Sequence, residues 1–282
     1  MDRKRKKRFG KIAIVMVLLF IAFVSLFPML YTLAGSFRTN VEIFKYALPF
    51  SIRTILPVEW TFENYYLLFT KYKFWQPILN TLILICILLP SGILINSVAA
   101  FAFSSFEFKF KKQLYVFFIL SFMIPGNALT MPLYRLISDL KLMDTRAAMV
   151  LPGIASGFLL FLFVQFFKDI PASLIEAARV DGAKWRTVYS KIILPLSKPV
   201  VITAGLMLFM GEWNSYLWPL LVARSKDIQT IQMALSDFST QYTTSWSLIL
   251  AGAMVSAVIP IFMFLPLQKY FVQGIASTGV KG

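Results

Sequence analysis

The segment EAARVDGAKWRTVYSKIILP, residues 176–195, places charged side chains between two long apolar runs. Pro171, just before it, suits the first turn of a helix, where its missing N–H has no partner to lose. Residues 173–180 are good helix formers, and Gly182 supplies the left-handed conformation that ends such a helix. A helix of two turns is not stable alone in water. The sequence therefore predicts a short helix that docks on another surface.

The rest of the chain is apolar. Of its 282 residues, 58% are hydrophobic and 15% are charged, and a soluble domain of this length does not need so much apolar surface. The composition predicts an integral membrane protein. The net charge of +15 would suggest a nucleic-acid partner for a soluble protein. In a membrane protein, basic residues hold loops on the cytoplasmic side, so we expect no nucleic-acid partner.

The sequence lacks the residue types that several kinds of functional site require. Histidine is absent and Cys86 is the single cysteine, which leaves no disulfide framework, no thiol cluster for a metal and no imidazole base. The sequence also holds no G-x-x-x-x-G-K-[ST] phosphate loop. We expect no catalytic residue, no metal and no cofactor in this chain. It is not expected to be an enzyme, and any use of ATP and Mg²⁺ requires a separate ATPase.

Crossing about 30 Å of hydrocarbon takes roughly 20 apolar residues. Six stretches satisfy this length and predict an all-α, polytopic membrane protein with six transmembrane helices. The apolar core of the first stretch, 12–30, is too long for the apolar region of a signal peptide. The predicted spans lie at about 12–35, 78–103, 113–135, 146–168, 199–222 and 247–269.

Lys and Arg set the orientation of such spans. With both ends inside, the inner segments hold roughly twice the density of basic residues found in the outer ones. Residues 1–11 then form a basic cytoplasmic N-terminus and residues 12–282 a single membrane domain. The loop 36–77 faces outward as a loop or short helix at the interface, and 168–198 and the tail 272–282 face the cytoplasm.

From composition alone, 168–198 could be an amphipathic loop resting on the membrane surface. Its spacing is more specific: Glu-Ala-Ala, three residues, Gly, nine residues and Ile-x-Leu-Pro fall on 176–178, Gly182 and 192–195. This pattern resembles the EAA loop of binding-protein-dependent ABC importer permeases. Four other segments resemble the carbohydrate branch of that family, the maltose permease (MalG) type: MIPGNALTMPLYRL (123–136), VQFFKDIP (164–171), EWNSYLWPLL (212–221) and QKYFVQGIASTGVKG (268–282).

The resemblance implies the type I ABC importer permease fold and a coupling helix that sits in a groove of an ATPase subunit. The coupling residues it implies are Glu176, Ala177, Ala178, Asp181, Gly182, Leu194 and Pro195. The C-terminal residues Gly279, Val280, Lys281 and Gly282 would insert between two ATPase subunits, although from physics alone they could equally be a frayed terminus. The implied partners are a second homologous permease, two ATPase subunits, an extracytoplasmic sugar-binding protein, sugar and membrane lipid.

One acidic residue, Glu212, lies inside a predicted span, where a charge is costly unless it faces a partner or a cavity. Aromatic faces stack on sugars, and Asn, Ser and Glu hydrogen-bond hydroxyl groups. A substrate path is therefore one interpretation of Glu212, Trp213, Asn214, Ser215, Tyr216 and Trp218. Hydrogen bonding between helices is the other. In the maltose system, the resemblance places the main sugar site in the partner permease.

These patterns predict the permease subunit of an ATP-driven sugar importer, of the oligosaccharide or disaccharide class, in a prokaryotic cell membrane. A permease for a polyol or glycerol phosphate is an alternative. A secondary transporter coupled to protons through Glu212 is another. The EAA spacing, and the lack of a second intramembrane acid or of any histidine, count against the proton-coupled alternative.

Overall fold

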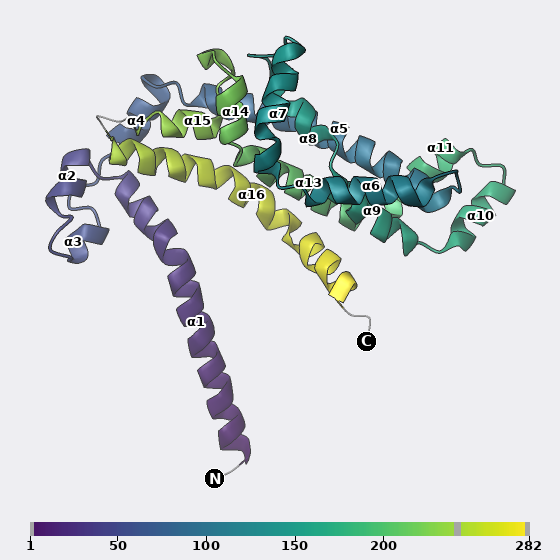
Figure 1. Ribbon diagram of the computed structural model, residues 1–282. Helices are drawn as coiled ribbons and strands as arrows, with labels where there is room; N and C mark the ends of the chain where they lie inside the picture. Colours follow the sequence, from purple (N-terminus) through teal and green to yellow (C-terminus); the bar gives the residue numbers. More distant parts are fainter. Residues whose placement is uncertain (1–2, 240–243, 280–282) are drawn as a thin grey trace. The chain divides into compact units, whose positions relative to one another are not determined.

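A computed structural model describes the backbone of residues 3–239 and 244–279, and the side chains of 11–239 and 244–268. All regular elements of this part are helices (Figure 1), which confirms the all-α prediction for it. The chain divides into two compact units, Met1–Phe74 with Leu235–Ile259, and Trp75–Ala234 with Pro260–Gly282. We describe each unit by itself.

Three helices are each long and apolar enough to cross a membrane, in the segments Lys11–Ser36, Trp75–Ser105 and Trp246–Gln268. Three bent pairs of shorter helices pass the same test together. If each pair is one span, the described residues hold up to six spans. The six-span arrangement and the placement of both termini inside stay predictions.

The first unit contains α1 (Arg3–Ser36), α2 (Asn40–Lys45), α3 (Ile52–Ile55), α4 (Glu63–Thr70) and the first part of α16 (Trp246–Gly279). Gly35 lies against α16, because a Cβ there would come within 2.6 Å of Leu250 Cδ1. The segment 36–77, predicted to contain a loop or short helix, contains three short helices. Helices α2, α3 and α4 alternate there with short connections, and Arg38 at its start is only 1% exposed.

The second unit is organised around α5 (Trp75–Ser105). This helix packs against α8 (Arg146–Ile154), α9 (Gly157–Lys168) and α13 (Lys198–Trp213). Its core includes Ala100 and Phe101 of α5, Phe163 of α9 and Ala204 of α13. The remaining elements of the unit are α6 (Lys111–Met123), α7 (Gly126–Asp139), α10 (Ala172–Val180), α11 (Trp185–Val188), η1 (Tyr189–Ile193), α12 (Leu194–Leu196), α14 (Leu217–Val222), η2 (Lys226–Ile228), α15 (Ile231–Ser236) apart from its last two residues, and the part of α16 that begins at Pro260.

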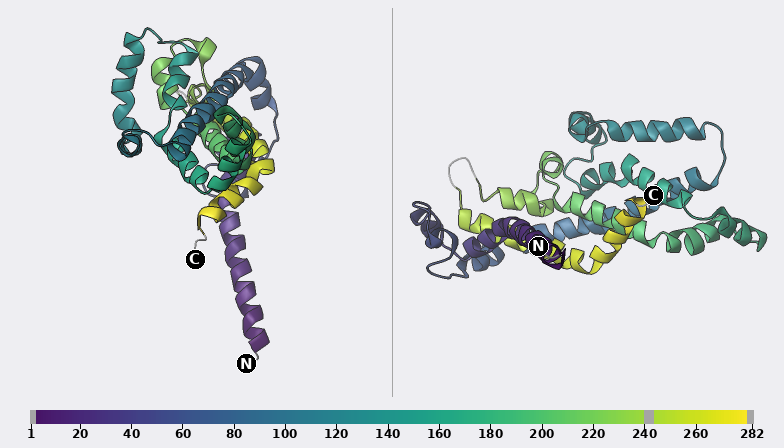
Figure 2. Two further views of the ribbon diagram at one scale, coloured as in Figure 1. Left: turned by 90° about the vertical axis from the view of Figure 1, so that its right-hand side faces the viewer. Right: turned by 90° about the horizontal axis from the view of Figure 1, so that it is seen from below.

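The third predicted span is not one straight helix. Helices α6 and α7 meet at an angle of 100°, and Figure 2 (right) shows one side-on and the other almost end-on. Pro125 lies at the break, and Ile124 before it is extended with φ −73° and ψ 124°. A residue before proline avoids the helical conformation because the proline ring crowds it. Hydropathy predicted the length of this segment but not its change of direction.

The fourth predicted span bends by 41° between α8 and α9. Asn96 of α5 bridges the break: its Nδ2 donates to Ile154 O at 2.8 Å, and its Oδ1 accepts from Ser156 N at 2.9 Å. The same Nδ2 donates to Gly92 O at 2.7 Å within α5. A buried amide side chain thus satisfies backbone groups that the bend removes from the helical ladder.

The fifth predicted span, 199–222, is also divided. Helix α13 ends at Trp213, and α14 begins at Leu217. The helical segment Trp185–Leu196 precedes α13 and meets it at 79°. This segment contains the π-helical turn η1, a wider turn in which backbone groups change partner. Pro195 follows this turn, and its ring nitrogen carries no hydrogen for a helical bond.

Candidate functional site

The predicted coupling segment forms a discrete helix at one end of the second unit (Figure 1). Pro171 is the N-cap of α10 rather than its first residue, one position earlier than expected. The helix ends at Gly182, whose φ is +82°. Ala183 N donates to Ala178 O at 2.9 Å and Gly182 N donates to Arg179 O at 3.1 Å. These two bonds form the Schellman motif, which confirms the predicted left-handed glycine.

Helix α10 has one packed face and one free face. Ile175 and Ala178 are half-buried against the core of the second unit. Glu176, Ala177 and Val180 are exposed, and Val180 is 87% exposed. Leu174 on the same helix is also 45% exposed, so α10 is open to contact with a partner. Of the two alanines of the motif, Ala177 is on the free face and Ala178 packs inward.

Arg179 and Trp185 close the turn between α10 and α11. The Arg179 guanidinium lies 4.6 Å from the centre of the Trp185 ring, and its Nη1 donates to Ala183 O at 2.6 Å. The Trp185 ring in turn packs edge-on against Phe106, with ring centres 4.6 Å apart. These contacts link the segment to the end of α5. The sequence analysis did not predict a role for either residue. Their separation of six positions, with a glycine turn between them, is compatible with such a cation–π contact.

The remaining coupling residues differ in exposure. Asp181 is the exposed C-cap of α10, Leu194 is half-buried and Pro195 is exposed. The deepest anchors of this stretch are Val188 and Ile193, which are buried in the core next to α5. Of the predicted tail, Gly279 is the last residue of α16, whereas Val280, Lys281 and Gly282 lie outside the described residues.

Glu212, near the end of α13, lines a cavity of about 350 Å³ beside the break between α8 and α9. Its side chain is 9% exposed, and its Oε1 has no hydrogen-bond partner among the described residues. Gly153 and Ser156 line the same cavity from α8 and from the N-cap of α9. Glu212 thus places one acidic residue in the wall of a largely apolar cavity, with its Oε1 buried.

The other five residues of the predicted path do not line this cavity. Trp213 is buried and stacks on Phe209, with ring centres 5.6 Å apart. Trp218 Nε1 donates to Ala148 O at 3.0 Å and so ties α14 to α8. Asn214 Nδ2 donates to Met210 O at 2.8 Å on its own helix. Ser215 is half-buried and Tyr216 is exposed. The two tryptophans thus serve helix packing, and Glu212 alone of the set faces this cavity.

The part of the chain with defined side-chain positions contains no group of three or more His, Cys, Asp and Glu residues that could hold a metal ion. Its notable features are apolar helices with breaks, a polar helix exposed at one end and an acidic cavity. Helices apolar and long enough to cross a membrane place the chain in the class of helical membrane proteins.

Residues 92–276 match the family model described as binding-protein-dependent transport system inner membrane component. The chain belongs to this family. It is therefore a multi-pass permease subunit of the cell membrane and not an enzyme, with ATP hydrolysis carried out by separate subunits.

Named relatives cover almost the whole chain. The arabinooligosaccharides transport system permease protein AraQ of Halalkalibacterium halodurans is 30% identical over 93% of this chain and 94% of its own length. The sn-glycerol-3-phosphate transport system permease protein UgpE of Rhizobium meliloti is 32% identical over 89% of this chain and 91% of its own. A chain of a bacterial ABC transporter involved in import of the acidic polysaccharide alginate superposes with a TM-score of 0.80 at 24% identity. The superposition covers 96% of this chain and 99% of the transporter chain. The chain therefore has the ABC importer permease fold.

Proposed function

We propose that this chain forms half of the translocation path of an ATP-driven importer of oligosaccharides or disaccharides. Family membership and a relative named for arabinooligosaccharide transport support the sugar class. The observation that carries the coupling role is the exposed face of α10, where Glu176, Ala177 and Val180 lie outside the core cluster of the described residues. A two-turn helix with such a face needs a partner.

The partner we assign to α10 is a cytoplasmic ATPase subunit. Glu176 accepts charge-assisted hydrogen bonds from basic groups of that subunit, and Ala177 allows close approach. Gly182 ends the helix without a side chain that would obstruct the groove. Asp181, Leu194 and Pro195 complete the segment, and the tail Gly279–Gly282 reaches between the two ATPase subunits. ATP and Mg²⁺ belong to those subunits.

The remaining partners are a second, homologous permease and an extracytoplasmic sugar-binding protein. We assign the six spans at the positions predicted from hydropathy, with the fifth at about 199–222 and with the N- and C-termini in the cytoplasm. Residues 12–282 then make one membrane domain, with 168–198 inside and 36–77 outside. The basic residues of 1–11 support this orientation.

Glycerol phosphate is a second candidate substrate, because UgpE is as similar to the chain as the sugar permease is. An anionic substrate and Glu212 would repel each other if the carboxylate were charged. A neutral sugar, by contrast, would meet no such repulsion at a cavity that Glu212 lines. The cavity therefore favours the sugar over the phosphate.

Uptake by the complete complex tests the proposal. The chain is co-purified with its ATPase, second permease and binding protein, and mass spectrometry identifies the solute carried by the binding protein. Vesicles containing the complex should take up this solute only with internal access to ATP. A sugar in the binding protein and ATP-dependent uptake support the proposal. Glycerol phosphate in the binding protein would show that the substrate is a glycerol phosphate and not a sugar. Uptake that follows a proton gradient without ATP would overturn the ATP-driven mechanism.

A further inference from the structure

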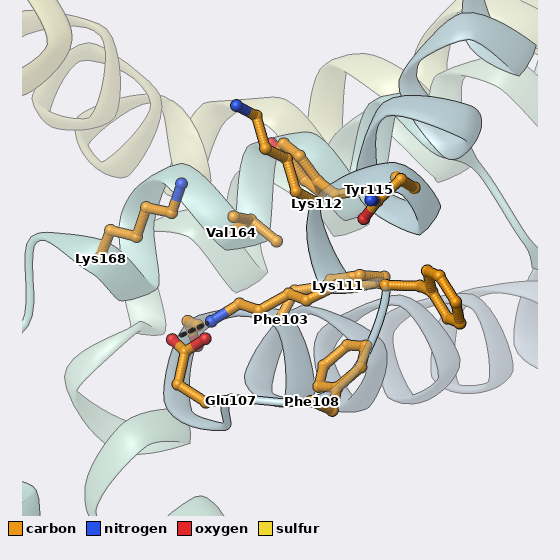
Figure 3. A pocket seen from close by; sticks show the side chains of 11 residues that line it. Phe103, Glu107, Phe108, Lys111, Lys112, Tyr115, Val164 and Lys168 are labelled. Atoms are coloured by element: carbon orange, nitrogen blue, oxygen red, sulfur yellow. Dashed lines mark hydrogen bonds and ion pairs between the residues drawn. The ribbon is translucent and has the colours of Figure 1, made fainter.

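A second cavity, of about 480 Å³, lies in the second unit where α5 ends, α6 begins and α9 ends. Figure 3 shows it from close by. Its lining combines three lysines, Lys111, Lys112 and Lys168, with a single acidic residue, Glu107. The lining thus carries an excess of positive charge, at the opposite end of α9 from the Glu212 cavity.

The lysines of this cavity are not equivalent. Lys111 Nζ lies 2.8 Å from Glu107 Oε1, so this charge is already matched. Lys112 and Lys168 have no carboxylate partner among the described residues. Figure 3 shows these two side chains extending from different helices, with both ammonium groups on the side of the pocket away from the Lys111–Glu107 pair. The Lys168 ammonium also lies 5.5 Å from the centre of the Tyr115 ring. Two ammonium groups without a carboxylate partner attract an anion to this side of the pocket.

The lining of this cavity also contains aromatic side chains. Phe103 packs against Phe108 and Tyr115, with ring centres 5.6 Å apart in each pair. Phe110 also lines the cavity and has a φ of 64°, in the left-handed region that bulky residues avoid. Strained backbone of this kind persists where the surroundings impose it and is frequent at ligand sites. The ligand therefore carries an apolar part beside its negative charge.

The position of the cavity along the helices identifies that ligand. Helix α5 is a membrane-spanning candidate that ends at Ser105, and α9 ends at Lys168. Ends of apolar spans lie at the level of lipid headgroups, where lysines extend to the interface and basic pockets bind anionic headgroups. We propose that Lys112 and Lys168 bind the phosphate of an anionic phospholipid, with its glycerol and upper acyl chain against the aromatic wall.

Lipid retention by the purified full-length chain tests this proposal. The protein in detergent is mixed with phosphatidylglycerol or with phosphatidylcholine, and native mass spectrometry counts the lipids that stay bound. Wild-type protein should retain phosphatidylglycerol in preference, and Lys112→Gln/Lys168→Gln should retain it roughly tenfold less well. Lys109→Gln is the matched control, because Lys109 lies over the Phe110 ring at 5.1 Å and does not line the cavity. It should bind like wild type.

A charge-preserving variant separates binding from folding. Lys112→Arg/Lys168→Arg should keep the preference for phosphatidylglycerol, and unfolding curves should show that both double variants are folded. Equal retention by Lys112→Gln/Lys168→Gln and wild type, or equal loss in Lys109→Gln, would overturn the site. Displacement of the lipid by millimolar inorganic phosphate would assign the cavity to a soluble anion instead. None of these results depends on transport, so the proposed function is tested separately.

Discussion

Arg38 and Glu42 form a buried ion pair one helical turn apart in the first unit, with Arg38 Nε 3.0 Å from Glu42 Oε1. The pair organises the chain around it. Arg38 Nη1 donates to Thr54 O at 2.8 Å, and Glu42 Oε1 accepts from Val58 N at 2.8 Å. Asn64 Nδ2 also donates to Arg38 O at 2.8 Å. The segment between α1 and α4 is therefore held by this polar cluster together with the packing of Phe37 against Trp60 and Phe62.

Removal of one member of this pair should unfold the segment. Arg38→Met leaves a buried carboxylate without its cation, which costs about 3–5 kcal/mol. We expect a lower midpoint of thermal unfolding for the purified protein and faster proteolysis within 39–60. Arg135→Met is the control, because the exposed Arg135–Asp139 contact is 3.9 Å long and should contribute nothing measurable. Equal stability of the two variants would show that the Arg38 cluster is not structural.

Gly182 should be needed for coupling and not for insertion. A Cβ at this position meets nothing within 4 Å, so the penalty for Gly182→Ala arises from its φ of +82° and amounts to about 1–2 kcal/mol. Asparagine tolerates this conformation better, so Gly182→Asn should keep more activity. Measured in vesicles, solute transported per ATP hydrolysed should fall for Gly182→Ala. Normal coupling in Gly182→Ala would contradict the role we give to this turn.

Glu176→Lys tests the exposed face of α10 without a conformational change. The side chain is exposed, so stability and membrane insertion should stay as in wild type. Reversal of its charge should repel the basic groups we expect on the ATPase. ATP hydrolysis should then no longer respond to the loaded binding protein. Ser173→Lys, at the exposed start of the same helix, is the control for added charge alone.

Asn96 should be essential for the bend between α8 and α9. Asn96→Leu leaves Ile154 O and Ser156 N without their side-chain partner, and each buried unsatisfied group costs about 1–3 kcal/mol. Thermal unfolding in detergent should shift downward by several degrees. Ser91→Ala on the same helix is a matched control, since Ser91 Oγ bonds only to α5 carbonyls, Ile87 O and Leu88 O. A similar shift in both variants would refute the bridging role.

Asp144 should make part of the stability dependent on pH. Hydrogen bonds from Ser225 N and Arg224 N, both at 2.8 Å, hold the pKa of Asp144 below its ordinary value of 3.8. A lowered pKa in the folded state means that the stabilisation is complete above the unfolded value and is lost as pH falls through the folded value. Asp144→Asn should remove this contribution while tolerating the φ of 61°. Unfolding midpoints between pH 5 and pH 3 should therefore fall less steeply in the variant.

The features that the sequence predicts best are local. The left-handed Gly182 follows from the few residues around it, and the length of α5 follows from hydropathy alone. The 100° bend at Pro125 is signalled by the proline, but its direction depends on what α7 packs against.

The remaining features depend on distant partners. Asn96 meets residues about sixty positions away, and Arg38 is buried by carbonyl and amide groups beyond α2. Aromatic residues beside Glu212 matched a sugar site in type, yet Phe209 and Ala148 determine that Trp213 and Trp218 pack between helices. No periodicity in the sequence encodes such partners, because they belong to other elements of the fold.

The contact of Arg179 with Trp185 bears on how motion crosses the membrane surface. With the glycine alone, the turn after α10 would be flexible, and a movement of the helix would not reach the elements beyond the turn. The Arg179 guanidinium lies over the Trp185 indole, and the indole packs against Phe106. These contacts make the turn rigid. Under the coupling role proposed for α10, these contacts would carry a displacement of the helix to Phe106, next to the end of α5.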